Sequence, residues 1–231
     1  MNVLSEDSIF GQIFGFLGNM IALNILGLVT SLPIVTIGAS TTAMYYTALK
    51  LHKDKDVTVW KAFFHSFKQN FMQATAIWAV FATVEALLLS CGFIGIGLIT
   101  GVLLLYIFPV IAAFSNTLGK LAGHAFYFAF HKPGYLIATA ALTCLPMYFT
   151  MVDAKLFPVY LLIWLMCGFS LTAYGNAWFY FWLFQLHLNT SVAFLTASVY
   201  LHPQSGQLRT TIIYITEIRL WLSLRITHSQ K

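Results

Sequence analysis

Long apolar runs separated by short polar segments make up most of the chain. No Asp, Glu, Lys or Arg occurs between Asp7 and Lys50. At about 1.5 Å of rise per residue, roughly 20 apolar residues cross a hydrocarbon core of about 30 Å. We therefore expect membrane-spanning helices at residues 72–91, 98–114, 135–151 and 157–184, in addition to one or two within the first 51 residues.

The first apolar run allows two geometries. Pro33 disfavours a helical conformation at the residue before it. Either a single span covers residues 19–39 with a kink at Pro33, and residues 40–51 lie at the membrane surface, or residues 9–30 and 33–51 form a hairpin of two spans. The sequence thus predicts a bundle of five spans, or of six if the hairpin forms.

The segment 52–71 is amphipathic with the period of a helix. Its aromatic rings recur at helical spacing, and they are Trp60, Phe63, Phe64, Phe67 and Phe71. Its basic residues recur on the opposite side, and they are Lys61, His65 and Lys68. This pattern favours an interfacial helix with its rings toward hydrocarbon and its bases toward lipid phosphates. The alternative is an ordinary first turn of the next span.

Composition agrees with a membrane protein. The chain has 231 residues, of which 59% are hydrophobic and 8% are charged, whereas a soluble domain carries about 25% charged residues. Its mean hydropathy is +0.81. We therefore predict an all-α integral membrane bundle. The net charge of +5 does not indicate nucleic acid, because the bases lie in interhelical segments and the tail.

The distribution of bases predicts orientation. If the 50–71 segment is cytoplasmic, alternation places 115–134 and the C-terminus there too, and then Lys155 is the one base of the twelve Lys and Arg residues on the other side. Excess Lys and Arg mark cytoplasmic loops. We expect a multi-pass protein of the cell membrane with the 50–71 segment and the C-terminus in the cytoplasm.

Five polar residues in or near the spans form the candidate polar intramembrane site: Thr36, Ser40, Glu85, Asn116 and Asn176. Glu85 is the one carboxylate inside a predicted span. It is either a proton relay or ligand in a polar cavity, or a hydrogen-bonded acid near the outer interface. The hydroxyls either satisfy backbone groups freed at Pro33 or line a substrate path. The amides, together with Asn24, are expected to link helices.

No motif for chemistry is present. The sequence has no GxSxG, HExxH, phosphate-binding loop or dinucleotide fingerprint. His124 and His131 are seven residues apart, but no carboxylate or cysteine joins them. The three cysteines lie in apolar runs without a CxxC pair and are expected to be buried thiols. We expect no catalytic residue, no cofactor and no metal, and hence a protein that is not an enzyme.

Two sequence blocks carry a family resemblance. Residues 31–42, SLPIVTIGASTT, with Tyr45 and Tyr46, and residues 63–75, FFHSFKQNFMQAT, are similar to the signature of the YesL-like family of bacterial multi-pass membrane proteins, a domain of unknown function. Residues 114–117 and 170–176 resemble its later motifs. The resemblance covers about residues 12–184. It implies a multi-pass protein, often associated with carbohydrate uptake and polysaccharide utilisation, and no catalytic residue.

The last part of the chain departs from this family. The resemblance ends near Gln185, and hydropathic alternation with period two follows at residues 217–226. A lone strand has no partner with which to pair. We therefore divide the chain into a membrane bundle, 1–184, and a divergent, poorly packed cytoplasmic tail, 185–231.

Three classes of function remain at this point. The first is a non-enzymatic accessory or assembly subunit, whose partners are the bilayer and other membrane subunits such as a sugar-uptake permease. The second is a small-solute transporter or channel, lined by the polar residues above. The third, an intramembrane enzyme, needs a nucleophile and base or paired acids, a constellation that the sequence does not offer. We favour the first class.

Overall fold

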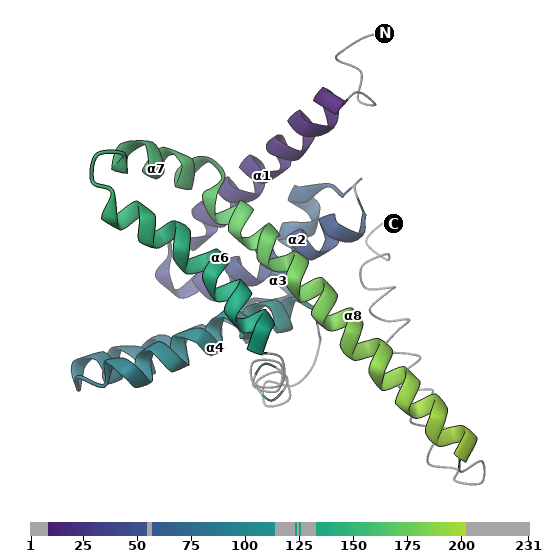
Figure 1. The fold of residues 1–231 in the computed structure, drawn as a ribbon. Helices are drawn as coiled ribbons and strands as arrows, with labels where there is room; N and C mark the ends of the chain where they lie inside the picture. Colours follow the sequence, from purple (N-terminus) through teal and green to yellow (C-terminus); the bar gives the residue numbers. More distant parts are fainter. Residues whose placement is uncertain (1–8, 55–56, 114–122, 124, 126–132, 202–231) are drawn as a thin grey trace. The chain divides into compact units, whose positions relative to one another are not determined.

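The computed structural model describes residues 9–54, 57–113, 123, 125 and 133–201, and the described chain is helical without strands. Its elements, labelled as in Figure 1, are α1 (Ile9–Ser31), η1 (Ile34–Thr36), α2 (Ile37–Lys53), α3 (Val59–Ser90), α4 (Ile94–Ala113), α6 (Pro133–Val152), α7 (Phe157–Ile163), η2 (Trp164–Gly168) and α8 (Phe169–Leu201). The chain forms two compact units, Met1–Trp178 and Phe179–Lys231. The all-α class predicted from the sequence is confirmed.

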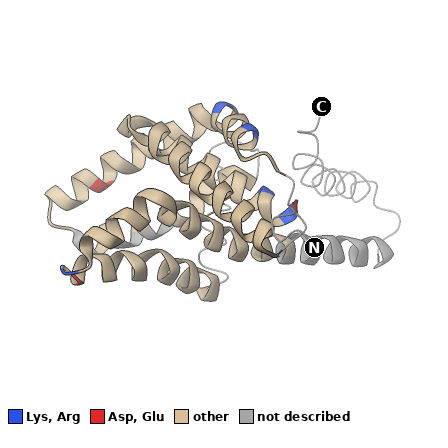
Figure 2. Cartoon of the chain, turned by 90° about the horizontal axis from the view of Figure 1, so that it is seen from above, with Lys and Arg blue, Asp and Glu red and all other residues tan. Residues whose placement is uncertain are grey.

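Four stretches of the described helices are long and apolar enough to cross a membrane. They are Phe10–Ser31, Val59–Ser90, Pro133–Val152 and Phe157–Gln185. Helix α4 adds a shorter apolar stretch, Leu104–Ala113. Figure 2 shows that Lys, Arg, Asp and Glu colour only short bands of these helices. The protein is therefore a multi-pass helical membrane protein.

Residues 9–53 form a helical hairpin, as in one of the two geometries that the sequence left open, although α2 is not among the stretches long and apolar enough to cross a membrane. Helix α1 ends at Ser31, Thr36 lies in the short turn η1, and α2 begins at Ile37. The two helices pack against each other next to this turn, where the Ser40 hydroxyl lies 2.8 Å from the carbonyl oxygen of Gly27. The alternative of one kinked span over 19–39 with 40–51 at the surface is wrong. Pro33 ends a helix here instead of kinking one.

Helix α2 lies at the centre of the first unit. Twelve of its 17 residues, spread from Gly38 to Lys50, are buried. They include small and hydroxyl side chains such as Ala39, Ala43 and Thr47, which allow neighbouring helices to approach closely. A segment that the sequence left as a possible surface helix thus has the largest share of buried residues among the described helices.

Helix α3 unites two elements that the sequence separated. It runs without a break from Val59 to Ser90, which is 32 residues or about 48 Å. The predicted interfacial segment 52–71 and the predicted span 72–91 therefore belong to one helix. The alternative interpretation, in which the amphipathic residues are the first turns of the next span, agrees with this helix better than a separate interfacial helix does.

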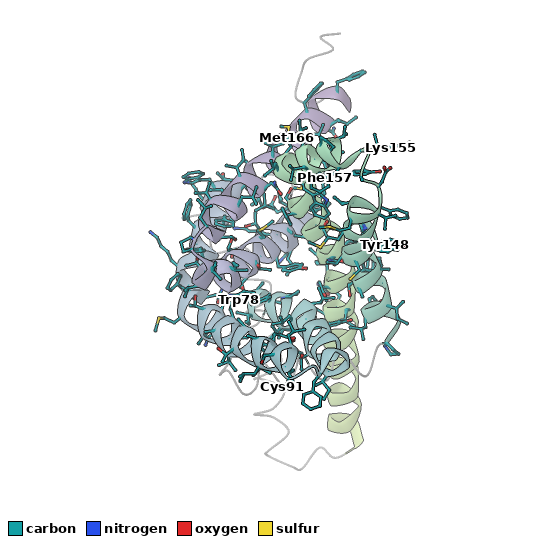
Figure 3. All side chains as sticks on the ribbon, turned by 90° about the vertical axis from the view of Figure 1, so that its left-hand side faces the viewer. Trp78, Cys91, Tyr148, Lys155, Phe157 and Met166 are labelled. Atoms are coloured by element: carbon teal, nitrogen blue, oxygen red, sulfur yellow. The ribbon has the colours of Figure 1, made fainter. Side chains whose placement is uncertain are left out.

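The later spans match their predicted positions with shifted ends. Helix α4 begins at Ile94 instead of residue 98, and α6 covers the predicted span 135–151 with one or two residues more at each end. In Figure 1, α6 and α7 form a hairpin whose turn lies at the left, on the same side as the turn between α3 and α4. Figure 3 views the protein from that side and labels Cys91 and Lys155 at these two turns.

Helix α8 runs past residue 184, where the predicted membrane bundle ends, and continues to Leu201. The first compact unit ends in sequence at Trp178, within this helix. The division into a bundle, 1–184, and a tail, 185–231, stays a prediction. The alternating segment 217–226 and the rest of the tail after Leu201 lie outside the described residues, so the poor packing of the tail stays a prediction.

Candidate functional site

The hydroxyl groups predicted near Pro33 close the turn between α1 and α2. The Thr36 hydroxyl donates to the carbonyl oxygen of Pro33 at 2.7 Å and to that of Thr30. The Ser40 hydroxyl contacts both the Gly27 carbonyl and the Thr30 hydroxyl at 2.8 Å. The Thr30 carbonyl lies in the last turn of α1, where carbonyl groups lack intrahelical donors. The Pro33 carbonyl also accepts from the Thr36 backbone N–H at 2.9 Å. Thr36 and Ser40 thus occupy structural positions.

Two glycines let the first three helices pack closely. A Cβ atom on Gly38 would lie 2.5 Å from the Ala74 carbonyl oxygen and 2.6 Å from the Trp78 Cβ, so only glycine fits there. The Trp78 indole also donates to the carbonyl oxygen of Ile34 at 2.8 Å, which ties α3 to the same turn. A Cβ on Gly27 would likewise collide with the Met44 sulfur. The turn is therefore a rigid junction of α1, α2 and α3.

Asn176 of α8 lies in a buried polar cluster, as we expected of an amide that links helices. Its amide Nδ2 donates to the Thr143 hydroxyl at 2.8 Å and lies 3.5 Å from the Tyr45 hydroxyl. Thr143 in turn donates to the Thr139 carbonyl at 2.8 Å, so it can only accept from Asn176. This fixes the orientation of the amide. The Asn176 Oδ1 atom is buried without a hydrogen-bond partner among the described residues.

The polar cluster joins four helices. Tyr45 comes from α2, Thr139 and Thr143 from α6, and Asn176 from α8. Tyr106 of α4 is fully buried and interacts with Thr139. Hydrogen bonds between helices inside an apolar bundle contribute about 0.6–2 kcal/mol each. The cluster therefore links helices and leaves one acceptor, on Asn176, for a donor from outside the described residues.

A second buried amide, Asn24 of α1, holds the π-helical segment η2. Its Nδ2 donates to the carbonyl oxygens of Trp164 at 3.0 Å and Leu165 at 2.8 Å, while its Oδ1 accepts from the Ser170 backbone N–H at 3.0 Å. A π turn displaces backbone groups from their usual α-helical partners. One fully buried side chain thus provides partners to backbone groups of a strained segment.

The π segment also contacts α6. The Trp164 indole donates to the Thr150 hydroxyl at 2.9 Å, and Thr150 donates to the Pro146 carbonyl at 2.7 Å. Gly168 leaves room for the Trp164 ring, because a Cβ on Gly168 would lie 2.6 Å from that ring. The segment is therefore fixed from two sides, by α1 and by α6.

Glu85 lies on the second half of α3 and faces α4. The Thr100 hydroxyl donates to its Oε1 atom. Its Oε2 atom lies 3.1 Å from the place that a Cβ on Gly97 would occupy. Gly97 thus allows α4 to pack closely against Glu85, whereas a Cβ on Gly101, one turn later, would meet no atom within 4 Å. The acid is thus hydrogen-bonded, as one of its two predicted roles supposes.

The aromatic residues of the first half of α3 do not all face one way. Phe63 is fully buried within the chain, whereas Trp60 is 62% exposed. The rings also contact one another along the helix, with Trp60 and Phe64 centroids 4.9 Å apart and Phe67 and Phe71 centroids 5.5 Å apart. Expecting Phe63 to face hydrocarbon was wrong, because this ring packs inside the helix bundle. Contact of the remaining rings with lipid stays a prediction.

The basic residues on the opposite side of α3 from these rings are exposed, as the amphipathic pattern predicts. Lys61 and Lys68 are exposed on α3. Lys50, which we counted among loop bases, is instead 6% exposed at the end of α2. Burial lowers the pKa of Lys50, and the negative charge of Asp54 opposes this shift. Lys50 is therefore a poor marker of the membrane surface.

His52 connects α2 to α8. Its Nε2 atom lies 2.9 Å from the Tyr174 carbonyl oxygen, and since a carbonyl only accepts, this nitrogen carries the proton. The imidazole also stacks on the Tyr174 ring with centroids 4.0 Å apart. Burial lowers the pKa of His52, and the hydrogen bond to Tyr174 opposes the shift. The contact fixes the basic end of α2 against α8.

The predictions for Asn116 and for the cysteines had different outcomes. Asn116 lies outside the described residues. The side chains of Cys91 and Cys144 are not covered by other residues of the chain, so the expectation of buried thiols was wrong for them. Sequence reasoning missed the cluster residues Thr139 and Thr143, although their spacing of four within an apolar run places both on one helix face. The π segment had no signal in the sequence.

The comparisons with known proteins give one match. A family model described as "Protein of unknown function, DUF624" matches residues 20–91, which is just under a third of the chain. No curated protein and no solved structure matches the chain. The matched region contains α2, the glycine Gly38, and both Asn24 and Glu85. The similarity thus covers the junction of α1, α2 and α3.

Proposed function

We propose that this chain is a non-enzymatic accessory or assembly subunit of a membrane complex. The observation that carries the proposal is the small buried share of its apolar spans. Within the chain's own fold, 6% of the most apolar window of α3 is buried, 11% of that of α6 and 28% of that of α1. Large faces of these helices therefore remain for lipid or for helices of other subunits.

The use of polar groups inside the bundle supports the same proposal. Asn24 bonds to the backbone of η2, Ser40 to the end of α1, and Thr143 to Asn176. Such bonds link helices to one another. A protein whose internal polar groups hold its own helices together, and whose outer faces are apolar, is suited to binding neighbours within a membrane.

The link to carbohydrate uptake rests on the YesL-like resemblance of residues 31–42 and 63–75. Both blocks fall inside the region that the family model matches, 20–91. We propose a sugar-uptake permease as the partner because that resemblance implies it. We also propose the cell membrane as the location, with the basic segment between α2 and α3 in the cytoplasm and the Cys91 turn outside.

The proposal is tested by photocrosslinking in native membranes. A photoreactive amino acid is placed at Met72 or at Val80, which are 79% and 62% exposed on α3. Ala74, which is fully buried, is the matched control position. We expect one protein partner to be joined from Met72 or Val80 but not from Ala74, and to co-purify at fixed stoichiometry in mild detergent. Crosslinks to lipid alone, with a particle of the chain's own 25.9 kDa, would contradict the proposal.

A second candidate is a small-solute transporter or channel, and one observation favours it. The buried Asn176 Oδ1 atom has no donor among the described residues. A hydroxyl group of a passing solute or a water molecule would supply one. This candidate predicts uptake of a labelled sugar by proteoliposomes and its loss on replacing Asn176 with leucine. Equal uptake by both proteins and by empty liposomes would exclude it.

A further inference from the structure

Glu85 lies at the contact between α3 and α4, where one residue of α4 donates a hydrogen bond to its carboxyl group and another leaves space for it. The Thr100 hydroxyl donates to Oε1, and Gly97, which is buried, leaves room for Oε2. Apart from Thr100 and Tyr106, α4 has no side chain able to form a hydrogen bond. Helix α4 therefore supplies one donor to this carboxyl group and has few others to offer.

The second carboxyl oxygen, Oε2, has no hydrogen-bond partner within the described part of the chain. Among the residues that the structure describes, Glu85 has one hydrogen bond, to Thr100, and no ion pair. Around it lie exposed apolar side chains: Leu89 on the next turn of α3 is 59% exposed, and Ile96, one turn before Thr100 on α4, is 50% exposed. The acid thus lies at the edge of an apolar surface that this chain does not cover.

The position of Glu85 along α3 places it in the outer part of a hydrocarbon core, near the boundary at the Ser90 end. It follows the exposed Lys68 by 17 residues, or about 26 Å, whereas the core is about 30 Å thick. It also lies five residues before the end of α3 at Ser90. Even near that boundary, an ionised carboxylate among apolar side chains is favoured by a cation beside it.

We propose that Glu85 binds the ammonium group of a lysine in a spanning helix of the partner subunit. The proposal rests on the accessory function above and names the chemistry of that partner. In such an ion pair the ammonium group donates a hydrogen bond to the carboxylate, and each charge compensates the other. The long lysine side chain reaches such a site while its stem packs on apolar residues such as Leu89 and Ile96. A second copy of this chain fits less well, because a two-fold contact through this face would bring together two acids.

The first test is a zero-length crosslink in native membranes. Dicyclohexylcarbodiimide is an apolar reagent that activates a carboxyl group and allows a neighbouring amine to form an amide with it. We expect a crosslinked peptide that joins Glu85 to a lysine within an apolar segment of the partner. We expect Glu85→Gln to abolish this peptide and to lower the amount of co-purified partner at least tenfold. Asp153, half-buried in the turn before α7, serves as a control carboxylate through Asp153→Asn.

A charge exchange completes the test. Once the partner lysine is known from the crosslinked peptide, replacing it with glutamate should abolish the complex, and combining that change with Glu85→Lys should restore it. Restoration separates an ion pair from a general loss of packing. Thr100→Val, which removes the one internal donor to Glu85, should weaken the complex less than Glu85→Gln does.

Two outcomes would overturn the pairing of Glu85 with a lysine but would leave the proposed accessory function standing. A stable complex that survives Glu85→Gln undiminished would show that the interface lies elsewhere. A carbodiimide product that joins Glu85 to the amine of phosphatidylethanolamine would identify a lipid as its partner. If photocrosslinking from Met72 and Val80 also finds no protein, the accessory function itself fails.

Discussion

Asn24 of α1 donates to the Trp164 carbonyl oxygen at 3.0 Å across 140 positions of sequence. Its Oδ1 atom accepts from the Ser170 backbone N–H at 3.0 Å, two residues after η2 ends at Gly168, so this one amide contacts backbone groups at the start of the π segment and just beyond its end. In a regular α-helix the carbonyl groups of Trp164 and Leu165 would accept from the backbone N–H groups of Gly168 and Phe169. The amide of α1 therefore helps to decide that the last spanning stretch contains a π turn.

Replacing Asn24 with leucine should destabilise the protein by about 3 kcal/mol or more, because buried backbone groups of η2 would lose their partners. The measurement is thermal unfolding in detergent, followed by tryptophan fluorescence. Asn19→Leu on the same helix is the control, since Asn19 lies partly exposed. Equal destabilisation by the two changes would show that the contact with η2 contributes nothing specific.

Gly38→Ala should destabilise the junction of α1, α2 and α3 by about 1–3 kcal/mol, because its new methyl group would collide with the Ala74 carbonyl and the Trp78 side chain. Gly18→Ala on α1 is the matched change, since nothing lies within 4 Å of its Cβ position. Alanine is the better helix former, so this control should be neutral or stabilising. Unfolding temperatures in one detergent decide the matter, and a neutral Gly38→Ala would mean that α2 and α3 separate without cost.

Phe63→Glu should unfold the first unit, because Phe63 is fully buried and a charged side chain there loses both packing and hydration. We expect a loss of about 3–5 kcal/mol or failure to express. Trp60→Glu, at a position 62% exposed on the same helix, should leave folding nearly unchanged. Size-exclusion profiles of the two variants compare them directly. A monodisperse Phe63→Glu protein would support an interfacial helix that detaches from the bundle.

Stability should fall as the pH drops below the ordinary histidine value of 6.5, in part because of His52. Burial lowers the pKa of His52 in the folded state, so the unfolded chain binds its proton more readily. The stabilisation is complete above pH 6.5 and is lost as the pH falls through the lower folded value. Unfolding temperatures of the native protein and of His52→Gln should converge at low pH. His65→Gln, at an exposed position, should retain the pH dependence of the native protein.

The hairpin of α1 and α2 predicts the side on which the N-terminus lies. If both helices cross the membrane, a reporter fused to Met1 and one placed after Lys53 should report the same compartment. A reporter after Asp153, and labelling of Cys91 by an impermeant maleimide, should report the opposite one. A reporter at Met1 on the side of Cys91 would show that only one of the two helices crosses.

The sequence alone determined the class of the protein and the approximate position of its spans. Apolar runs long enough to cross a bilayer have few stable alternatives to helices, since every backbone group must find a partner within the membrane. This local constraint gave α6 and α4 to within a few residues. A disturbance of the helix at Pro33, as either a kink or a turn, and hydrogen bonding of the Thr36 and Ser40 hydroxyls to nearby backbone groups also follow from local chemistry.

Tertiary packing decided what local pattern could not. Whether Pro33 kinks one helix or separates two depends on the fit of Gly38 against α3. The periodicity of the rings from Trp60 to Phe71 does not reveal that Phe63 packs inside the bundle instead of facing lipid. Apolar side chains suit both environments. The π segment requires Asn24, which is remote in sequence. The partners of Asn176 and Glu85 arise where separate helices meet, and an apolar pattern along one helix carries no record of its neighbours.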